Sequence, residues 1–316
     1  MEFREHQLAN GLQVVAECNP QAHTAAVCFM VRAGSRDEGP EVAGVSHFLE
    51  HMVFKGTPTL TAEEVNRRFD ELGAEHNAWT TKENTVYYAV MLPEYQREIV
   101  ELWADVLRPW PSLREEDFDT EKQVILEEIR MYEDQPPFCA DEKCEKNFFG
   151  DHPLGNSVLG SIDSIRDLRV DAMRDYFRTH YSPRNIIVAA AGKIDFDQLV
   201  QTVQRRCGGW ESFEVQRELT PPCPRAGFEV VHKATAAQQY VMGLSPAPAA
   251  TDTRRFAADM LATLVGDSSG SRLYWELLHP GHVEQASLHY YEYDGAGVLA
   301  SWLCCEPQEA AANLRR

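Results

Sequence analysis

The first 110 residues contain short apolar runs that are bounded by glycine, proline or small polar residues. Runs with these boundaries are typical of strands, whereas apolar residues that recur every three or four positions indicate helices. The predicted strands are residues 12–16, 24–33, 77–80 and 85–91. Helices are predicted within residues 44–57, 61–73, 93–107, 112–132 and 197–206.

Residues at the ends of two of these helices support their assignment. Thr61 and Glu64 form the pattern of a capping box, in which each side chain accepts a hydrogen bond from the other residue's backbone N–H. Gly73 is expected to end this helix. Pro93 suits the first turn of the next helix, because proline lacks an N–H that would be unpaired there.

The second half of the chain repeats this order of elements. A proline-containing segment without periodicity precedes it, and we interpret that segment as an interdomain linker. The second half is predicted to have strands at 228–234 and 238–245, helices at 253–266 and 271–279, and a hairpin formed by 287–295 and 297–307. The recurrence indicates an internal duplication. The predicted division is a first domain (1–210), a linker (211–227) and a partial second domain (228–316).

The acidic composition limits the classes of partner. The chain has 316 residues, 44% of them hydrophobic, and 30 Lys and Arg against 49 Asp and Glu, so its formal net charge is −19. This charge argues against a nucleic-acid binder and against binding to anionic membranes, and it would attract basic peptides.

The sequence also bears on the cellular compartment. It has no apolar segment typical of a signal peptide and no stretch long and apolar enough to span a bilayer. The eight cysteines include no C-x-x-C pair, so reduced and mostly buried thiols are expected, and a structural zinc site is not. We therefore expect a cytoplasmic protein.

The segment GVSHFLEHMVFKGT, residues 44–57, contains the pattern H-x-x-E-H in His47, Glu50 and His51. In a helix the two histidines lie one turn apart on one face, with Glu50 beside them. Two such imidazoles can bind one zinc ion, and the carboxylate can take a proton from a water that the metal activates. The alternative is a helix with two surface histidines, because so short a pattern also arises by chance.

A candidate third ligand lies in the acidic segment 112–132. Glu121 and Glu128 differ by seven positions, two helical turns, so they share a face of a helix. Glu127 is rotated by about 100° from Glu128. The alternative for these glutamates is a solvated acidic face.

These spacings resemble the pitrilysin and insulysin superfamily of inverted zincins, especially its shorter branch similar to mitochondrial processing peptidase. In that family a glutamate ligand follows the second histidine by 76 or 77 residues, and here Glu128 follows His51 by 77. The resemblance implies one zinc ion per chain with His47, His51 and Glu128 as ligands. It also implies that Glu50 is the general base and that Glu121 orients a ligand histidine.

The resemblance extends to substrate binding and to the fold. Asn77 and Ala78 resemble the edge strand with which family members pair the backbone of a peptide substrate. Residues 152–160 and 181–195 are also similar to family segments. The implied fold is α+β, with two homologous domains that each have a mostly antiparallel sheet covered by helices, half of a clamshell, the second domain being incomplete.

The second half departs from the family pattern. Residues 253–266 take the place of the 44–57 helix and contain no histidine. Active members supply an arginine and a tyrosine from a stretch of the type R-E-x-x-G-L-x-Y, whereas residues 277–287, LLHPGHVEQAS, contain neither. Arg272 and Tyr274 lie nearby as candidate substitutes, and the alternative for Arg272 is a structural role in a Ser-Arg-Leu turn. Losing one such donor typically costs about a hundredfold or more in rate.

The sequence therefore predicts a zinc-dependent endopeptidase that acts on extended peptides, with activity that is reduced or dependent on a partner. The first alternative is a non-catalytic or partner-dependent subunit of a heteromeric peptidase. The expected partners are a peptide substrate and a second copy or a different chain that supplies a second half. A second alternative is an assembly subunit like the core proteins of respiratory complexes, which would associate with membrane proteins.

Overall fold

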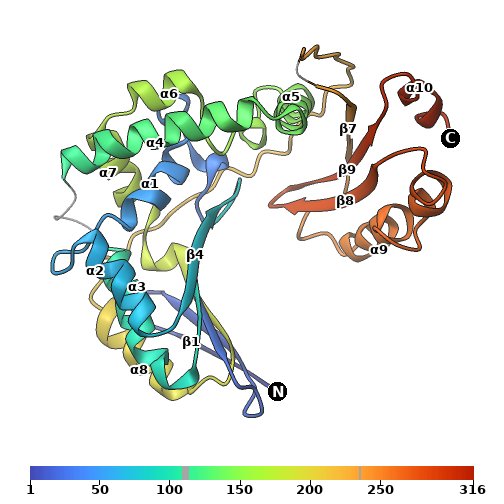
Figure 1. Cartoon of the computed structure of the whole chain (residues 1–316). Helices are drawn as coiled ribbons and strands as arrows, with labels where there is room; N and C mark the ends of the chain where they lie inside the picture. Colours follow the sequence, from blue (N-terminus) through green and yellow to red (C-terminus); the bar gives the residue numbers. More distant parts are fainter. Residues whose placement is uncertain (109–113, 235) are drawn as a thin grey trace. The chain divides into compact units, whose positions relative to one another are not determined.

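A computed structural model describes residues 1–108, 114–234 and 236–316. The chain forms two compact units (Figure 1). Unit 1 comprises Met1–Ile129 and Ser157–Arg217, and unit 2 comprises Arg130–Asn156 and Glu218–Arg316. The start predicted for a helix at residue 112 lies outside the described residues. No helix in the described ranges has the length and apolarity that crossing a membrane requires.

Unit 1 is built on a six-stranded sheet with the order β1-β2-β6-β3-β5-β4. Only β2 and β6 pair in parallel, so the sheet is mostly antiparallel. Along β3 every second residue is buried, which is the period that the pleat of a strand requires. The strands are β1 (Glu2–Gln7), β2 (Gln13–Cys18), β3 (Ala25–Val31), β4 (Glu75–Thr80), β5 (Thr85–Met91) and β6 (Ile186–Gly192).

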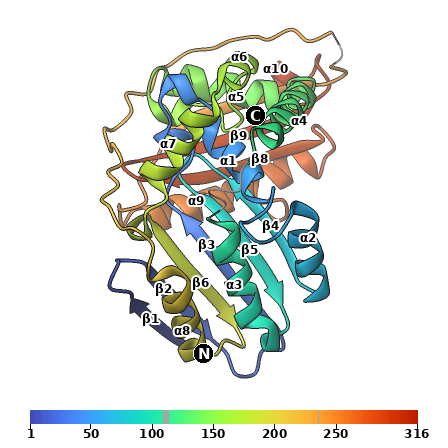
Figure 2. The same ribbon diagram turned by 90° about the vertical axis from the view of Figure 1, so that its left-hand side faces the viewer.

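Helices cover one face of this sheet, where α3 and α8 lie over the strands (Figure 2). The predicted capping box is confirmed, because Thr61 N donates to Glu64 and Glu64 N donates to Thr61 Oγ1. The helices of unit 1 are α1 (Val45–Val53), α2 (Ala62–Glu71), α3 (Gln96–Val106), α4 (Glu115–Glu133, whose end belongs to unit 2), α6 (Ile162–Asp167), α7 (Val170–His180) and α8 (Phe196–Cys207). Short 3-10 turns occur at η1 (Ser35–Asp37), η2 (Pro40–Val42), η3 (Pro93–Tyr95) and η5 (Pro183–Asn185).

Unit 2 contains a three-stranded antiparallel sheet with the order β7-β9-β8. Its elements are α5 (Pro136–Phe149), η4 (Pro153–Gly155), β7 (Gln239–Pro246), α9 (Arg255–Gly266), the π-helical turn η6 (Tyr274–Leu278), β8 (Gln285–Tyr293), β9 (Ala296–Cys305) and α10 (Ala310–Asn313). In unit 1 the corresponding strands β3, β5 and β4 have the same order, with α1 between β3 and β4 as α9 lies between β7 and β8. The expected duplication is therefore present in the topology.

The predicted strand at 228–234 is wrong, because these residues form neither a helix nor a strand. Phe228 and Val230 are 87% and 72% exposed. Their alternating apolar pattern has no neighbouring strand to pair with and no core to face, and alternation alone does not make a strand stable.

The division into units also differs from the predicted domains. Residues 130–156 belong to unit 2, because Phe148 and Phe149 of α5 pack in one buried cluster with Val298 of β9. The start of the predicted linker belongs to unit 1, where Arg217 donates two hydrogen bonds of 2.8 Å to the carboxylate of Asp37. Neither long-range contact has a local signal in the sequence.

Gly44, which precedes α1, tests how closely this helix is packed. Its φ is +90°, and a Cβ there would lie 2.6 Å from the carbonyl oxygen of Leu159. We expect Gly44→Ala to lower the free energy of unfolding by about 2–5 kcal/mol. Gly73, with φ +60° and open space around it, is the matched control, and Gly73→Ala should cost only about 1 kcal/mol. Urea unfolding measures both, and equal losses would contradict close packing at Gly44.

Candidate metal centre

Helix α1 carries His47 and His51 on one face, with their ring centroids 4.6 Å apart. The helix forms here because Phe48, Leu49 and Met52 are fully buried and anchor its other faces in the core of unit 1. The predicted helix is confirmed, and the interpretation of both histidines as surface residues is excluded, since His47 is buried and His51 is half-buried.

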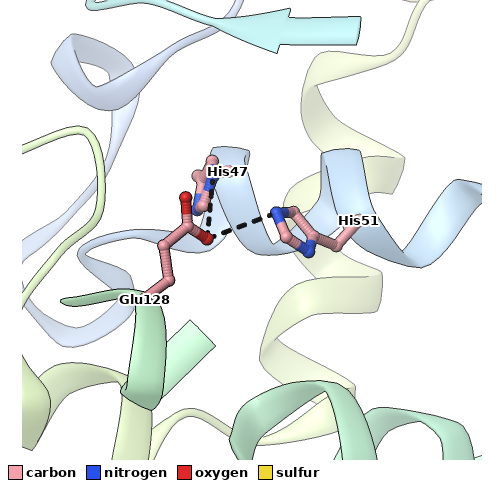
Figure 3. A group of neighbouring side chains, drawn as sticks. All are labelled: His47, His51 and Glu128. Atoms are coloured by element: carbon pink, nitrogen blue, oxygen red, sulfur yellow. Dashed lines mark ion pairs between the residues drawn. The ribbon is translucent and has the colours of Figure 1, made fainter. Parts of the chain in front are cut away.

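Glu128 of α4 points at both imidazoles (Figure 3). Its Oε2 lies 3.8 Å from His47 Nε2 and 3.7 Å from His51 Nε2. Within the described part of the chain, these three residues are the one group whose ligand atoms lie together as a metal site requires, all within 4.8 Å of one another. The structure therefore brings together the three ligands that the sequence predicted.

The donor set fits zinc, which binds imidazole nitrogens and carboxylate oxygens in a tetrahedral arrangement. Two atoms that are each about 2.1 Å from a tetrahedral zinc lie about 3.4 Å apart. The observed separations of 3.7 and 3.8 Å need only a small adjustment of the side chains to reach this value.

Glu121 lies beside the cluster and is buried. Its Oε1 lies 2.7 Å from His51 Nδ1, and its Oε2 forms an ion pair with Lys55. Burial raises the pKa of Glu121, but the hydrogen bonds from His51 and Lys55 outweigh it and hold this pKa below its usual value. A proton on His51 Nδ1 leaves Nε2, the nitrogen nearer Glu128, with a lone pair for a metal.

His47 is suited to act as a neutral ligand. Burial, followed by the neighbouring His51, lowers the pKa of His47 to about 3. Burial also lowers the pKa of His51, but the Glu121 hydrogen bond and the charges of Glu121 and Glu128 outweigh it and raise this pKa overall. The imidazole of His47 is therefore neutral, and the imidazole of His51 carries a proton that it donates to Glu121.

Glu50 lies on α1 between the two histidines and outside the ligand group. Burial raises the pKa of Glu50, and the hydrogen bond from Thr80 opposes this shift. Thr80 Oγ1 donates to Glu50 Oε2 at 2.5 Å. A half-buried carboxylate with a raised pKa is a better proton acceptor than a solvated one.

Asn77 and Ala78 lie in the middle of β4, the edge strand next to β5. The side chain of Asn77 is exposed, and its Oδ1 accepts a hydrogen bond of 2.9 Å from Ala78 N. β4 packs against α1, so the strand predicted to bind a peptide adjoins the helix that carries the histidines. The role of Asn77 and Ala78 in binding stays a prediction.

Three supporting residues were missed in the sequence. Lys55 lies one turn after His51, and this spacing could have suggested that Lys55 pairs with a carboxylate near the histidines. Thr80 ends a predicted strand, and Glu38 lies in a loop, and neither has a local signal. Both Glu38 oxygens accept backbone hydrogen bonds at the start of α1, from Gly44 N at 2.6 Å and Ser46 N at 2.7 Å.

Two family profiles match the chain. The profile described as Insulinase (Peptidase family M16) matches residues 13–162, and the profile described as Peptidase M16 inactive domain matches residues 167–315. The first match contains the three predicted ligands and Glu50, and the second begins at residue 167, the last residue of α6 in unit 1.

Curated relatives cover nearly the whole chain. An uncharacterised zinc protease of Streptomyces coelicolor is 33% identical over 97% of this chain and 68% of its own length. An uncharacterised zinc protease of Mycobacterium tuberculosis is 34% identical, and the aligned region covers 99% of this chain and 72% of that protein. Another, from Bacillus subtilis, is 31% identical, and the aligned region covers 94% of this chain and 72% of that protein.

Solved structures share the fold. The structure described as a protease from Helicobacter pylori has a TM-score of 0.88 at 24% identity and covers 97% of this chain and 75% of its own. A putative M16-like peptidase from Alicyclobacillus acidocaldarius has a TM-score of 0.82 at 24% identity, with 99% and 77% covered. A fold of two homologous α+β domains is therefore one that other proteins share.

Glu128 and its neighbour Glu127 allow a matched test of the ligand set. We expect Glu128→Ala to lower zinc affinity by at least a hundredfold, because it removes one of three donors, whereas Glu127→Ala should keep zinc near one per chain. Metal content after dialysis, measured by mass spectrometry, distinguishes them. Equal metal content in the two variants would refute Glu128 as a ligand.

The cap at Glu38 predicts a pH dependence of stability. Burial raises the pKa of Glu38 to about 7 from its ordinary 4.5, against the opposing hydrogen bonds from Ser46 and Gly44. Between pH 4.5 and 7 the folded chain holds a proton on Glu38 that the unfolded chain has released. The contribution of Glu38 to the free energy of unfolding is therefore fully present below pH 4.5 and is lost as the pH rises to 7.

Glu38→Gln removes this titration and keeps an oxygen acceptor. We expect the free energy of unfolding of the wild type to fall by up to about 3 kcal/mol relative to the variant between pH 4.5 and 7, since one pKa unit corresponds to about 1.4 kcal/mol. Urea unfolding at a series of pH values measures the difference. Parallel curves for the two proteins would show that Glu38 does not titrate in this window.

Proposed function

Because the chain belongs to peptidase family M16, the insulinase family, we propose that it is a zinc-dependent endopeptidase that hydrolyses peptide bonds in extended peptides or unfolded segments. The observation that carries this proposal is the cluster of His47, His51 and Glu128 with the non-ligand carboxylate of Glu50 beside it. The similarity to the mitochondrial-processing-peptidase branch stays a prediction, since the relatives do not separate the branches.

Zinc is the cofactor that this site fits, and His47, His51 and Glu128 would hold one ion per chain. When bound, it supplies a Lewis acid that activates water and polarises the carbonyl of a peptide bond. Glu121 holds the proton on His51 Nδ1 and so keeps the ring oriented, while Lys55 balances the charge of that buried carboxylate.

Glu50 is the proton carrier in this proposal. Its carboxylate takes a proton from the attacking water and gives it to the nitrogen of the leaving amine, so that Glu50 ends the cycle ionised. The pKa of Glu50 is raised toward neutral pH, at which one group can both accept and release a proton.

The peptide would lie along the outer edge of β4, beside Asn77 and Ala78. An edge strand offers unpaired backbone groups, and an extended peptide that adds to it gains hydrogen bonds that do not depend on sequence. This accounts for extended or unfolded segments as the substrate class. The net charge of −19 favours basic peptides within that class.

Two observations favour a second candidate, a non-catalytic or partner-dependent subunit of a heteromeric peptidase. Residues 277–287 contain no arginine and no tyrosine, and the profile that matches residues 167–315 describes an inactive domain. A second copy or a different chain would then supply the missing groups. The intact ligands and Glu50 favour the peptidase.

Glu50→Gln is the direct test of the proposed chemistry. The amide cannot accept the proton, so we expect cleavage of a quenched fluorescent peptide library to fall by at least a thousandfold while zinc stays near one per chain. Glu63→Gln, an exposed change on α2, is the control and should cleave like the wild type. Chelator-sensitive cleavage by Glu50→Gln would refute the role of Glu50 as the proton carrier. A wild type that binds zinc and cleaves only after a partner is added would support the second candidate.

A further inference from the structure

The hydrogen bond between Thr80 and Glu50 joins two parts of the site that are far apart in the sequence. Thr80 is the last residue of β4, and Glu50 lies on α1. Their side chains meet at 2.5 Å, between Thr80 Oγ1 and Glu50 Oε2. In the described part of the chain this is the one hydrogen bond made by the Glu50 carboxylate, which leaves Oε1 without a partner there.

The single hydroxyl proton of Thr80 has one strong acceptor. Thr85 Oγ1 lies 3.5 Å away, at the limit of a hydrogen bond, and its own proton is donated to the carbonyl oxygen of Ala33 at 3.0 Å. The carboxylate of Glu50 is an ångström closer and carries charge, so the Thr80 proton is directed to it. The bond is therefore directional and holds one chosen oxygen of Glu50.

The position of Thr80 in β4 connects this bond to the expected path of the peptide. Ala78 and Thr80 are two residues apart, so their side chains point to the same face of the sheet, about 7 Å apart along the strand. Thr80 also pairs with Thr85 at the closed end of the β4–β5 hairpin, and a turn between Thr81 and Asn84 holds that end. The donor to Glu50 therefore lies at the end of the edge strand that this turn holds.

We propose that Thr80 is a positioning residue that holds Oε2 of Glu50, directs Oε1 to the reacting water, and fixes the base relative to the strand on which the peptide lies. This inference rests on the proposed peptidase function. A carboxylate that is free to rotate would place its accepting oxygen correctly for only part of the time, so losing the hydroxyl should lower kcat and leave KM almost unchanged.

Three substitutions separate positioning from the packing of the hairpin. Thr80→Val keeps the shape and the β-branched side chain but removes the hydroxyl, and Thr80→Ser keeps the hydroxyl. Thr85→Val removes the other hydroxyl of the same cross-strand pair, which donates to Ala33 O and not to Glu50. We expect kcat to fall by about tenfold to a hundredfold in Thr80→Val and by less than about threefold in Thr80→Ser and Thr85→Val. KM should stay within about threefold, and zinc near one per chain, in all three.

A structural readout makes the test independent of activity. In crystals of the metal-free proteins we expect the Glu50 carboxylate to keep its orientation in Thr80→Ser and to rotate or split into two conformers in Thr80→Val. An unchanged Glu50 in Thr80→Val, a kcat equal to that of the wild type, or the same slow kcat in Thr80→Ser would each overturn the proposal. A wild type that cleaves no peptide would instead refute the proposed function, and the crystal structures would still decide the role of Thr80.

Discussion

The hydrogen bond between His51 and Glu121 is the interaction on which the centre depends. It joins α1 to α4 and places the proton of His51 on Nδ1, so that Nε2 is left for a metal beside Glu128. Glu121 and Glu128 are two turns apart on α4, and the position of one therefore fixes the position of the other. Lys55 makes the burial of Glu121 tolerable, because a buried carboxylate without a cation would favour its protonated form.

Three kinds of contact hold α1 in this arrangement. Apolar residues bury the helix, Glu38 accepts hydrogen bonds from the backbone at its start, and Thr80 holds Glu50 on the side of the edge strand. The corresponding helix α9 in unit 2 contains no histidine, although its strands have the same order as those of unit 1. Duplication thus reproduced the topology, and among the described residues the group of possible metal ligands lies in the first copy.

The sequence predicted what local patterns determine. The bounds of β5 agree with the structure, and the capping box of α2 is present. Spacing with the family resemblance predicted the three candidate ligands that the structure brings together. Contacts between distant segments could not be predicted, and Glu38, Thr80 and the place of α5 in unit 2 depend on such contacts. The strand expected at 228–234 failed for the same reason, since a strand needs a partner that a single segment does not reveal.

The central claim is that this chain binds one zinc ion through His47, His51 and Glu128. Anomalous diffraction at the zinc edge, from crystals of the purified chain, tests it most directly. The account predicts one peak, in contact with Nε2 of both histidines and with the Glu128 carboxylate, and with Glu121 still bonded to His51 Nδ1. A zinc-supplied crystal with no peak at these residues, or with a peak held by other side chains, would contradict it.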